Sequence, residues 1–178
     1  EQVVRTLTNA IQTQIRYTGV HFGHATIVPW PPKETLKRQF GDCKDQATLA
    51  VGLLRALGIE AHGALLRTGP GFDVDARLPS LEGFDHAIVF VPGSPAIWVD
   101  PTARYTRAGS LPEPDLGRQA LIAAPTTTGL TRTPRSTHEE NRTATLREVF
   151  LAKKGESRIV ETIEAWGVPE SNLRSNFT

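Results

Sequence analysis

Apolar positions recur every three or four residues near the start of the chain, as they do along one face of a helix. They are Val3, Val4, Leu7, Ile11 and Ile15. This spacing predicts an amphipathic helix over about residues 2–16. The prolines within residues 29–32 end any helix there, and residues 33–40 read as a short second helix.

A third helix is predicted over residues 43–57, and it is the clearest element in the pattern. Asp42 is a good N-cap, and Asp45 three residues later is typical of a capping box. Gly58 is a natural stop at the other end. The apolar face is formed by Ala47, Ala50, Leu53, Leu54 and Leu57. Cys43 therefore lies in the first turn of this helix.

Strands are predicted where the apolar runs are short and turn residues bound them. Residues 59–67 read as one strand, and residues 87–91 and 96–99 read as a hairpin joined by the turn at 92–95. A second hairpin is predicted from residues 143–151 and 157–166. Residues 110–140 are rich in Pro, Thr and Gly, which favours an ordered loop or a linker.

Composition and charge narrow the class of protein. The chain has 178 residues, 39% of them apolar, and a net charge of +1. A net charge this close to zero argues against nucleic acid or an anionic membrane as the main partner. No run approaches the roughly 18 apolar residues of a membrane span. The chain has no methionine and its ends are polar, so it reads as a piece of a larger protein with flanking domains.

Cys43 is the only cysteine, which rules out an internal disulfide and makes this residue a candidate nucleophile. A helix N-terminus favours the thiolate, and Lys44 adds a positive charge, although Asp42 and Asp45 oppose it. The first-turn backbone N–H of Cys43 lacks a helical partner and could donate to an oxyanion. The alternative is a small buried core residue, because free cysteine is often buried.

His86 and Asp100 supply a candidate base and a group to orient it. His86 begins one strand of the predicted hairpin and Asp100 ends the other. Counting from the turn places them close to direct opposition, where Cβ atoms are about 5 Å apart. Either residue alone could be structural, His86 as a satisfied histidine and Asp100 as a turn residue. As a pair with Cys43 upstream, they favour a Cys-His-Asp triad for acyl transfer.

Other residues are candidates for a metal site or a substrate cleft. His21 and His24 are three apart, but three or four zinc ligands cannot be assembled around them, so neither a metal nor a cofactor is expected. Tyr17 and Trp30 are candidates to line the cleft, with core packing as the alternative. The long loop over residues 68–83 is expected to form one wall of it.

Several of these motifs together resemble bacterial transglutaminase-like domains, in the transglutaminase and papain-like superfamily of cysteine enzymes. The resemblance covers about residues 1–105. The motifs are Ile15-Arg16-Tyr17, Gly41-Asp42-Cys43-Lys44-Asp45, the helix end at residues 53–59, Asp85-His86-Ala87-Ile88-Val89 and Trp98-Val99-Asp100-Pro101-Thr102.

The resemblance implies an α+β papain-like core, with Cys43 on a helix packed against an antiparallel sheet. It implies Cys43 as nucleophile, His86 as base and then acid, and Asp100 as orienter. It also suggests an extracytoplasmic location. Animal cross-linking transglutaminases carry a tryptophan directly after the cysteine, where this chain has Lys44. Calcium-dependent cross-linking is therefore not expected.

These observations together predict a cysteine enzyme that cleaves or transfers peptide or side-chain amides through a thioester, with hydrolysis favoured. Residues 1–140 are expected to form the catalytic domain, and residues 141–178 a hairpin suited to the start of a flanking β-rich module. Asp42 and Lys44 join Tyr17 and Trp30 as candidate cleft residues. The alternative is a catalytically silent binding or scaffolding module of the same fold.

Overall fold

The computed structural model describes residues 1–19, 26–69, 71–77, 80–107 and 109–177. His21 and His24 lie outside these residues. The chain divides into two units, Glu1–Arg135 and Ser136–Thr178, and each is described by itself.

The first unit is built from three helices and a sheet. The helices are α1 (Gln2–Gln14), α2 (Pro32–Arg38) and α3 (Cys43–Ala56), each within two residues of the predicted bounds. The strands of the sheet are β3 (His62–Leu66), β4 (His86–Val91), β5 (Ile97–Val99), β6 (Gln119–Ile122) and β7 (Thr131–Arg132). In the described connections, 3-10 turns include η2 (Leu81–Gly83) and η3 (Glu113–Asp115).

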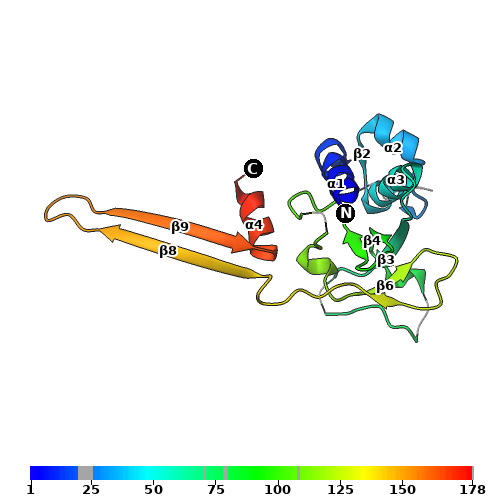
Figure 1. Cartoon of the computed structure of the whole chain (residues 1–178). Helices are drawn as coiled ribbons and strands as arrows, with labels where there is room; N and C mark the ends of the chain where they lie inside the picture. The colour runs from blue at the N-terminus through cyan, green and yellow to red at the C-terminus, as the bar shows by residue number, and fades with distance from the viewer. Residues whose placement is uncertain (20–25, 70, 78–79, 108, 178) are drawn as a thin grey trace. The chain divides into compact units, whose positions relative to one another are not determined.

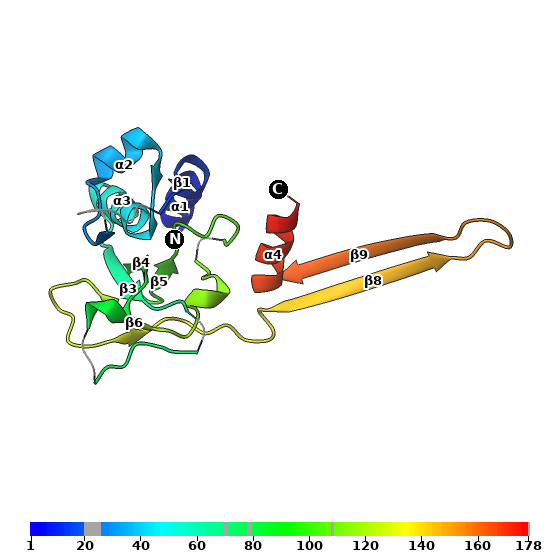
Figure 2. The same ribbon diagram turned by 180° about the vertical axis from the view of Figure 1, so that it is seen from behind.

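The five strands form one antiparallel sheet in the order β5-β4-β3-β6-β7. The three helices lie together over one face of it, as Figure 1 and the reverse view in Figure 2 both show. Ala87, Val89 and Val91 pack under α1 and α3, while Ile88 belongs to a second apolar cluster with Trp98. This is the alternation of a strand buried on both faces. The expected α+β class is confirmed.

A two-stranded parallel ladder holds the start of α3 in place. β1 (Arg16–Tyr17) pairs with β2 (Phe40–Gly41), so that Tyr17 is the partner of Gly41. The glycine is needed because a Cβ at position 41 would lie only 2.6 Å from Cβ of Asp45 on α3. The backbone of β2 can therefore run directly beside the first turn of the helix.

The prediction of a loop or linker over residues 110–140 was wrong in part. The segment includes β6, which is a central strand because it pairs with β3 on one side and β7 on the other. β6 is only four residues long and is flanked by turn-forming residues. Its strand character comes from pairing with β3, which local composition does not encode.

The second unit is a long hairpin followed by a helix. β8 (Arg142–Phe150) pairs antiparallel with β9 (Arg158–Trp166), and α4 (Val168–Asn176) follows β9. The ribbon is largely exposed on both faces. Figure 1 shows α4 beside the base of the ribbon, and the sequence pattern had not indicated this helix. Within the described ranges, no helix has the length and hydropathy to cross a membrane.

Candidate active site

The first turn of α3 presents Cys43. Asp42 caps the helix, its Oδ1 accepting a hydrogen bond from the backbone N–H of Asp45 at 3.2 Å. The reciprocal bond of a capping box is replaced by another contact, because Asp45 Oδ1 accepts from the backbone N–H of Trp30 at 2.8 Å. Cys43 is half-buried at the edge of the core cluster. As the first helical residue, its amide has no partner within the helix.

The β4–β5 hairpin brings His86 and Asp100 together. His86 Nε2 lies 3.1 Å from Asp100 Oδ2. The two residues are close, as predicted, but not directly opposite, because Val91 pairs with Ile97 and the connection is centred on residue 94. Continuing this register places Asp100 opposite Ile88, on a diagonal from His86. A diagonal neighbour is still within reach of a long side chain.

Asp100 is held in place from three directions. Its Oδ1 accepts from the backbone N–H and the hydroxyl of Thr102, at 2.8 and 2.7 Å. Gln12 on α1 donates its side-chain amide to the backbone carbonyls of Asp100 and Ala103, at 3.2 and 2.9 Å. Burial alone would raise the pKa of Asp100. The hydrogen bond and charge of His86, together with the hydrogen bonds from Thr102, outweigh burial and lower this pKa. The carboxylate is therefore ionised and oriented.

The electrostatics of His86 tie the three groups together. Burial opposes the imidazolium and would lower the pKa of His86. Hydrogen bonds with Asp100 and with the side chain of Cys43, and the charges of Asp100 and Asp115, outweigh burial and raise the pKa to about 11. The geometry thus places the imidazole between a thiol at a helix start and a carboxylate, as an acyl-transfer site requires.

A second buried carboxyl joins this cluster, and the sequence analysis missed it. Asp115, at the end of η3, is fully buried. One ligand-type atom each of His86, Asp100 and Asp115 lie within 4.8 Å of one another. Burial, followed by the charge of Asp100, raises the pKa of Asp115 to about 7. No local motif marks Asp115, because only the folded path of residues 111–118 brings it to the candidate triad.

The four candidate cleft residues are in different situations. Tyr17 is about half exposed, and partial burial of its side chain raises its pKa. Charges on Cys43, Asp42 and Asp100 raise it further, so Tyr17 lies near the candidate triad. Asp42 is buried and pairs with Lys44, so both side chains are already engaged. Trp30 is exposed, with its ring under the guanidinium of Arg38 at 4.7 Å.

The long loop after β3 is anchored near the His86 end of the sheet. Asp85 Oδ1 accepts from the backbone N–H of Thr68 at 2.8 Å. Farther along, the carboxylate of Asp73 accepts from the backbone N–H of Gln119 at 3.1 Å. The described part of the loop is therefore tied to the start of β6.

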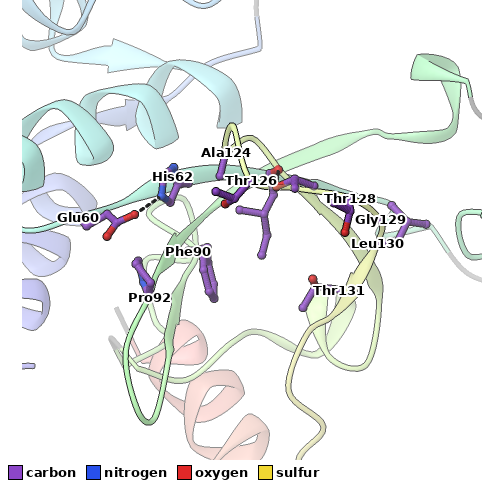
Figure 3. Close-up of a pocket in the computed structure, with 12 residues that line it drawn as sticks. Glu60, His62, Phe90, Pro92, Ala124, Thr126, Thr128, Gly129, Leu130 and Thr131 are labelled. Atoms are coloured by element: carbon purple, nitrogen blue, oxygen red, sulfur yellow. Dashed lines mark hydrogen bonds and ion pairs between the residues drawn. The ribbon is translucent and has the colours of Figure 1, made fainter.

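A cavity of about 350 Å³ lies elsewhere on the first unit (Figure 3). It is lined by His62 and Phe90 and by the segment over residues 126–131. His62 and Phe90 are register partners at one end of the β3–β4 pair, whereas His86 is at the other end. His62 Nε2 lies 3.0 Å from Glu60 Oε1, drawn as the dashed line in Figure 3. None of the predicted site residues lines this cavity.

Comparison with known proteins finds a family that the first part of the chain resembles. Residues 1–77 match the family model described as the transglutaminase-like superfamily. This part of the chain is thus similar to the transglutaminase-like superfamily, as its motifs had suggested. The comparisons with curated proteins and with solved structures gave no match.

Proposed function

We propose that the unit Glu1–Arg135 is a cysteine enzyme that acts on peptide or side-chain amides through a thioester intermediate. The observation that carries the proposal is the position of His86, which bonds Asp100 at 3.1 Å and reaches the side chain of Cys43 at the start of α3. The transglutaminase-like superfamily commonly contains cysteine enzymes, which agrees with this assignment.

In the first half of the reaction, the Cys43 thiolate attacks the amide carbonyl carbon. A C–S bond forms, and the oxyanion accepts a hydrogen bond from the backbone N–H of Cys43. His86 then gives its proton to the amide nitrogen, the C–N bond breaks, and the amine leaves. The product on the protein is a thioester, and His86 is left as the neutral imidazole.

In the second half, His86 takes a proton from a water molecule that attacks the thioester. The C–S bond breaks, releasing a carboxylic acid and restoring the thiolate and the imidazolium. Asp100 keeps the ring oriented throughout, because its Oδ1 is fixed by Thr102 and its Oδ2 faces His86. An amine in place of water would give transfer, but no amine-binding feature points to it, so we favour hydrolysis.

The proposal can be tested with a thiol-reactive probe built on a peptide amide. The labelling rate of Cys43 is compared in wild type, His86→Gln and His62→Gln. His62 is a matched control because it too is a hydrogen-bonded histidine with little exposed surface, on the neighbouring strand β3. We expect His86→Gln to slow labelling by at least about tenfold, the scale of general acid–base catalysis. Equal labelling of all three proteins, or none, would favour the silent binding module.

A further inference from the structure

Asp115 lacks the partners that a buried carboxylate needs. Its side chain is fully buried, and neither Oδ1 nor Oδ2 has a hydrogen-bond donor among the described residues. An ionised carboxylate in this position would leave both acceptors unsatisfied, at a large cost in desolvation. A protonated carboxyl can instead donate a hydrogen bond, and a carboxylate oxygen is a suitable acceptor for it.

Asp100 offers that acceptor. Its Oδ1 already takes two hydrogen bonds from Thr102, while its Oδ2 takes one from His86. A carboxylate oxygen accepts two bonds, so Oδ2 retains capacity for one more. One side-chain atom each of His86, Asp100 and Asp115 lie within 4.8 Å of one another. At such a distance in a buried site, two ionised carboxylates would repel each other strongly.

The charged groups around Asp115 come from three elements. Asp100 follows β5 and disfavours ionisation of Asp115, whereas His86 on β4 and Arg118 before β6 favour it. Arg118 is committed elsewhere, since its guanidinium donates to the carbonyls of Pro114 and Thr68. Burial and Asp100 prevail over these cations and raise the pKa of Asp115 to about 7.

We propose that Asp115 is a positioning residue of the triad, which holds a proton and donates it to Asp100. The site is then a row of four groups, Cys43, His86, Asp100 and Asp115, with one negative charge shared by the two carboxyls. The proton on Asp115 fixes the second oxygen of Asp100 and draws charge from it, so that His86 releases its proton more readily to a leaving amine. The catalytic part of this inference rests on the proposed function.

Two substitutions of Asp115 distinguish the loss of its hydrogen-bond donor from a change in side-chain volume. Asp115→Asn keeps the shape and supplies an N–H donor, whereas Asp115→Leu keeps the approximate volume and supplies none. Glu113→Gln is the matched control, because it removes an exposed carboxylate from the same short turn. We expect Asp115→Asn to label at Cys43 within about threefold of wild type, and Asp115→Leu at least about tenfold more slowly, the loss expected for one hydrogen bond to a charged group.

A second readout needs no activity. The midpoint of urea unfolding is measured between pH 4 and pH 8 for wild type, Asp115→Asn and Glu113→Gln. Unfolded Asp115 releases its proton near pH 3.8 and folded Asp115 near pH 7, so the folded state binds the extra proton between these values. Wild type should therefore lose stability relative to Asp115→Asn as the pH rises through this window. Glu113→Gln should follow wild type.

Each outcome either supports the proposal for Asp115 or overturns part of it. A difference between wild type and Asp115→Asn that does not vary with pH would overturn the shared proton, whether or not the protein is active. Equal labelling of the Asn and Leu variants would overturn the positioning role. If Asp115→Leu fails to fold, the pH series of Asp115→Asn still decides. If wild type instead gains stability relative to Asp115→Asn as the pH rises, and EDTA abolishes this gain, a divalent cation and not a proton occupies the position, which also overturns the proposal. Failure of all proteins to label, with the pH effect intact, would reject only the proposed function.

Discussion

His86 and Asp100 form a hydrogen bond at 3.1 Å although the hairpin register sets them on a diagonal. The bond depends on how the segment after β5 is fixed, because Asp100 lies just beyond the last residue of that strand. Thr102 fixes the carboxylate, and Gln12 fixes the backbone. The candidate triad is thus assembled by α1, α3 and the hairpin together.

Asp100→Asn should impair chemistry more than folding. The amide oxygen can still accept from Thr102, so we expect the melting temperature to change by only a few degrees. The amide N–H₂ facing His86 would favour the wrong tautomer, and labelling of Cys43 should fall by orders of magnitude. Thermal unfolding and probe labelling on the same samples measure both. A large loss of stability with unchanged labelling would assign Asp100 a purely structural role.

Gln12→Ala should loosen the segment that carries Asp100. The substitution removes two hydrogen bonds, one to the carbonyl of Asp100 and one to that of Ala103, although both oxygens still accept from a backbone N–H. At about 0.5–1.5 kcal/mol for each bond, the loss should cost about 1–3 kcal/mol of unfolding free energy. It should also slow labelling of Cys43. Gln14→Ala on the same helix is the control, because Gln14 is exposed. Equal urea midpoints for the two variants would show that the Gln12 bonds contribute nothing.

Gly41→Ala should disturb the first turn of α3. The new methyl would lie 2.6 Å from Cβ of Asp45, so either β2 or the helix start must move. Overpacking of this kind costs about 1–3 kcal/mol. Gly63→Ala is a suitable comparison, since a Cβ there meets nothing within 4 Å. Urea midpoints measure the cost, and similar midpoints for the two variants would contradict the close packing described here.

His86 should make stability depend on alkaline pH. Its pKa is 6.5 in the unfolded chain and about 11 in the folded one, so the folded state holds an extra proton between these values. Its contribution is fully present below about pH 6.5 and is lost as the pH rises toward 11. The unfolding free energy of wild type should fall relative to His86→Gln by at most about 1.4 kcal/mol per pH unit. Parallel curves from pH 7 to 10 would contradict the coupling of His86 to Asp100.

The sequence was informative where local rules decide the structure. The apolar face of residues 43–57, with Asp42 before it, predicted α3 to within one residue. The turn at residues 92–95 predicted the β4–β5 hairpin, and with it the meeting of His86 and Asp100. Turn length limited the accuracy, because a shift of one residue in the centre of a hairpin moves the pairing by two.

The features of the site that the sequence did not predict depend on contacts between segments far apart in the chain. Asp115 follows a proline-rich turn and nothing near it in the sequence signals a role, yet the folded chain places it against Asp100. Gln12 reads as an ordinary polar residue of an amphipathic helix, but it is buried and bonds a segment about 90 residues away. Such roles follow from tertiary packing, which periodicity does not report.

The central claim is that Cys43 forms an acyl-enzyme with the help of His86. The most direct measurement is the intact mass of the protein after brief incubation with an activated acyl ester, with acid quenching and peptide mapping. We predict one acyl group per chain, located on Cys43, absent from Cys43→Ala, and formed at least about tenfold more slowly in His86→Gln. Acylation at equal rates in wild type and His86→Gln, or no acylation of Cys43, would contradict the account.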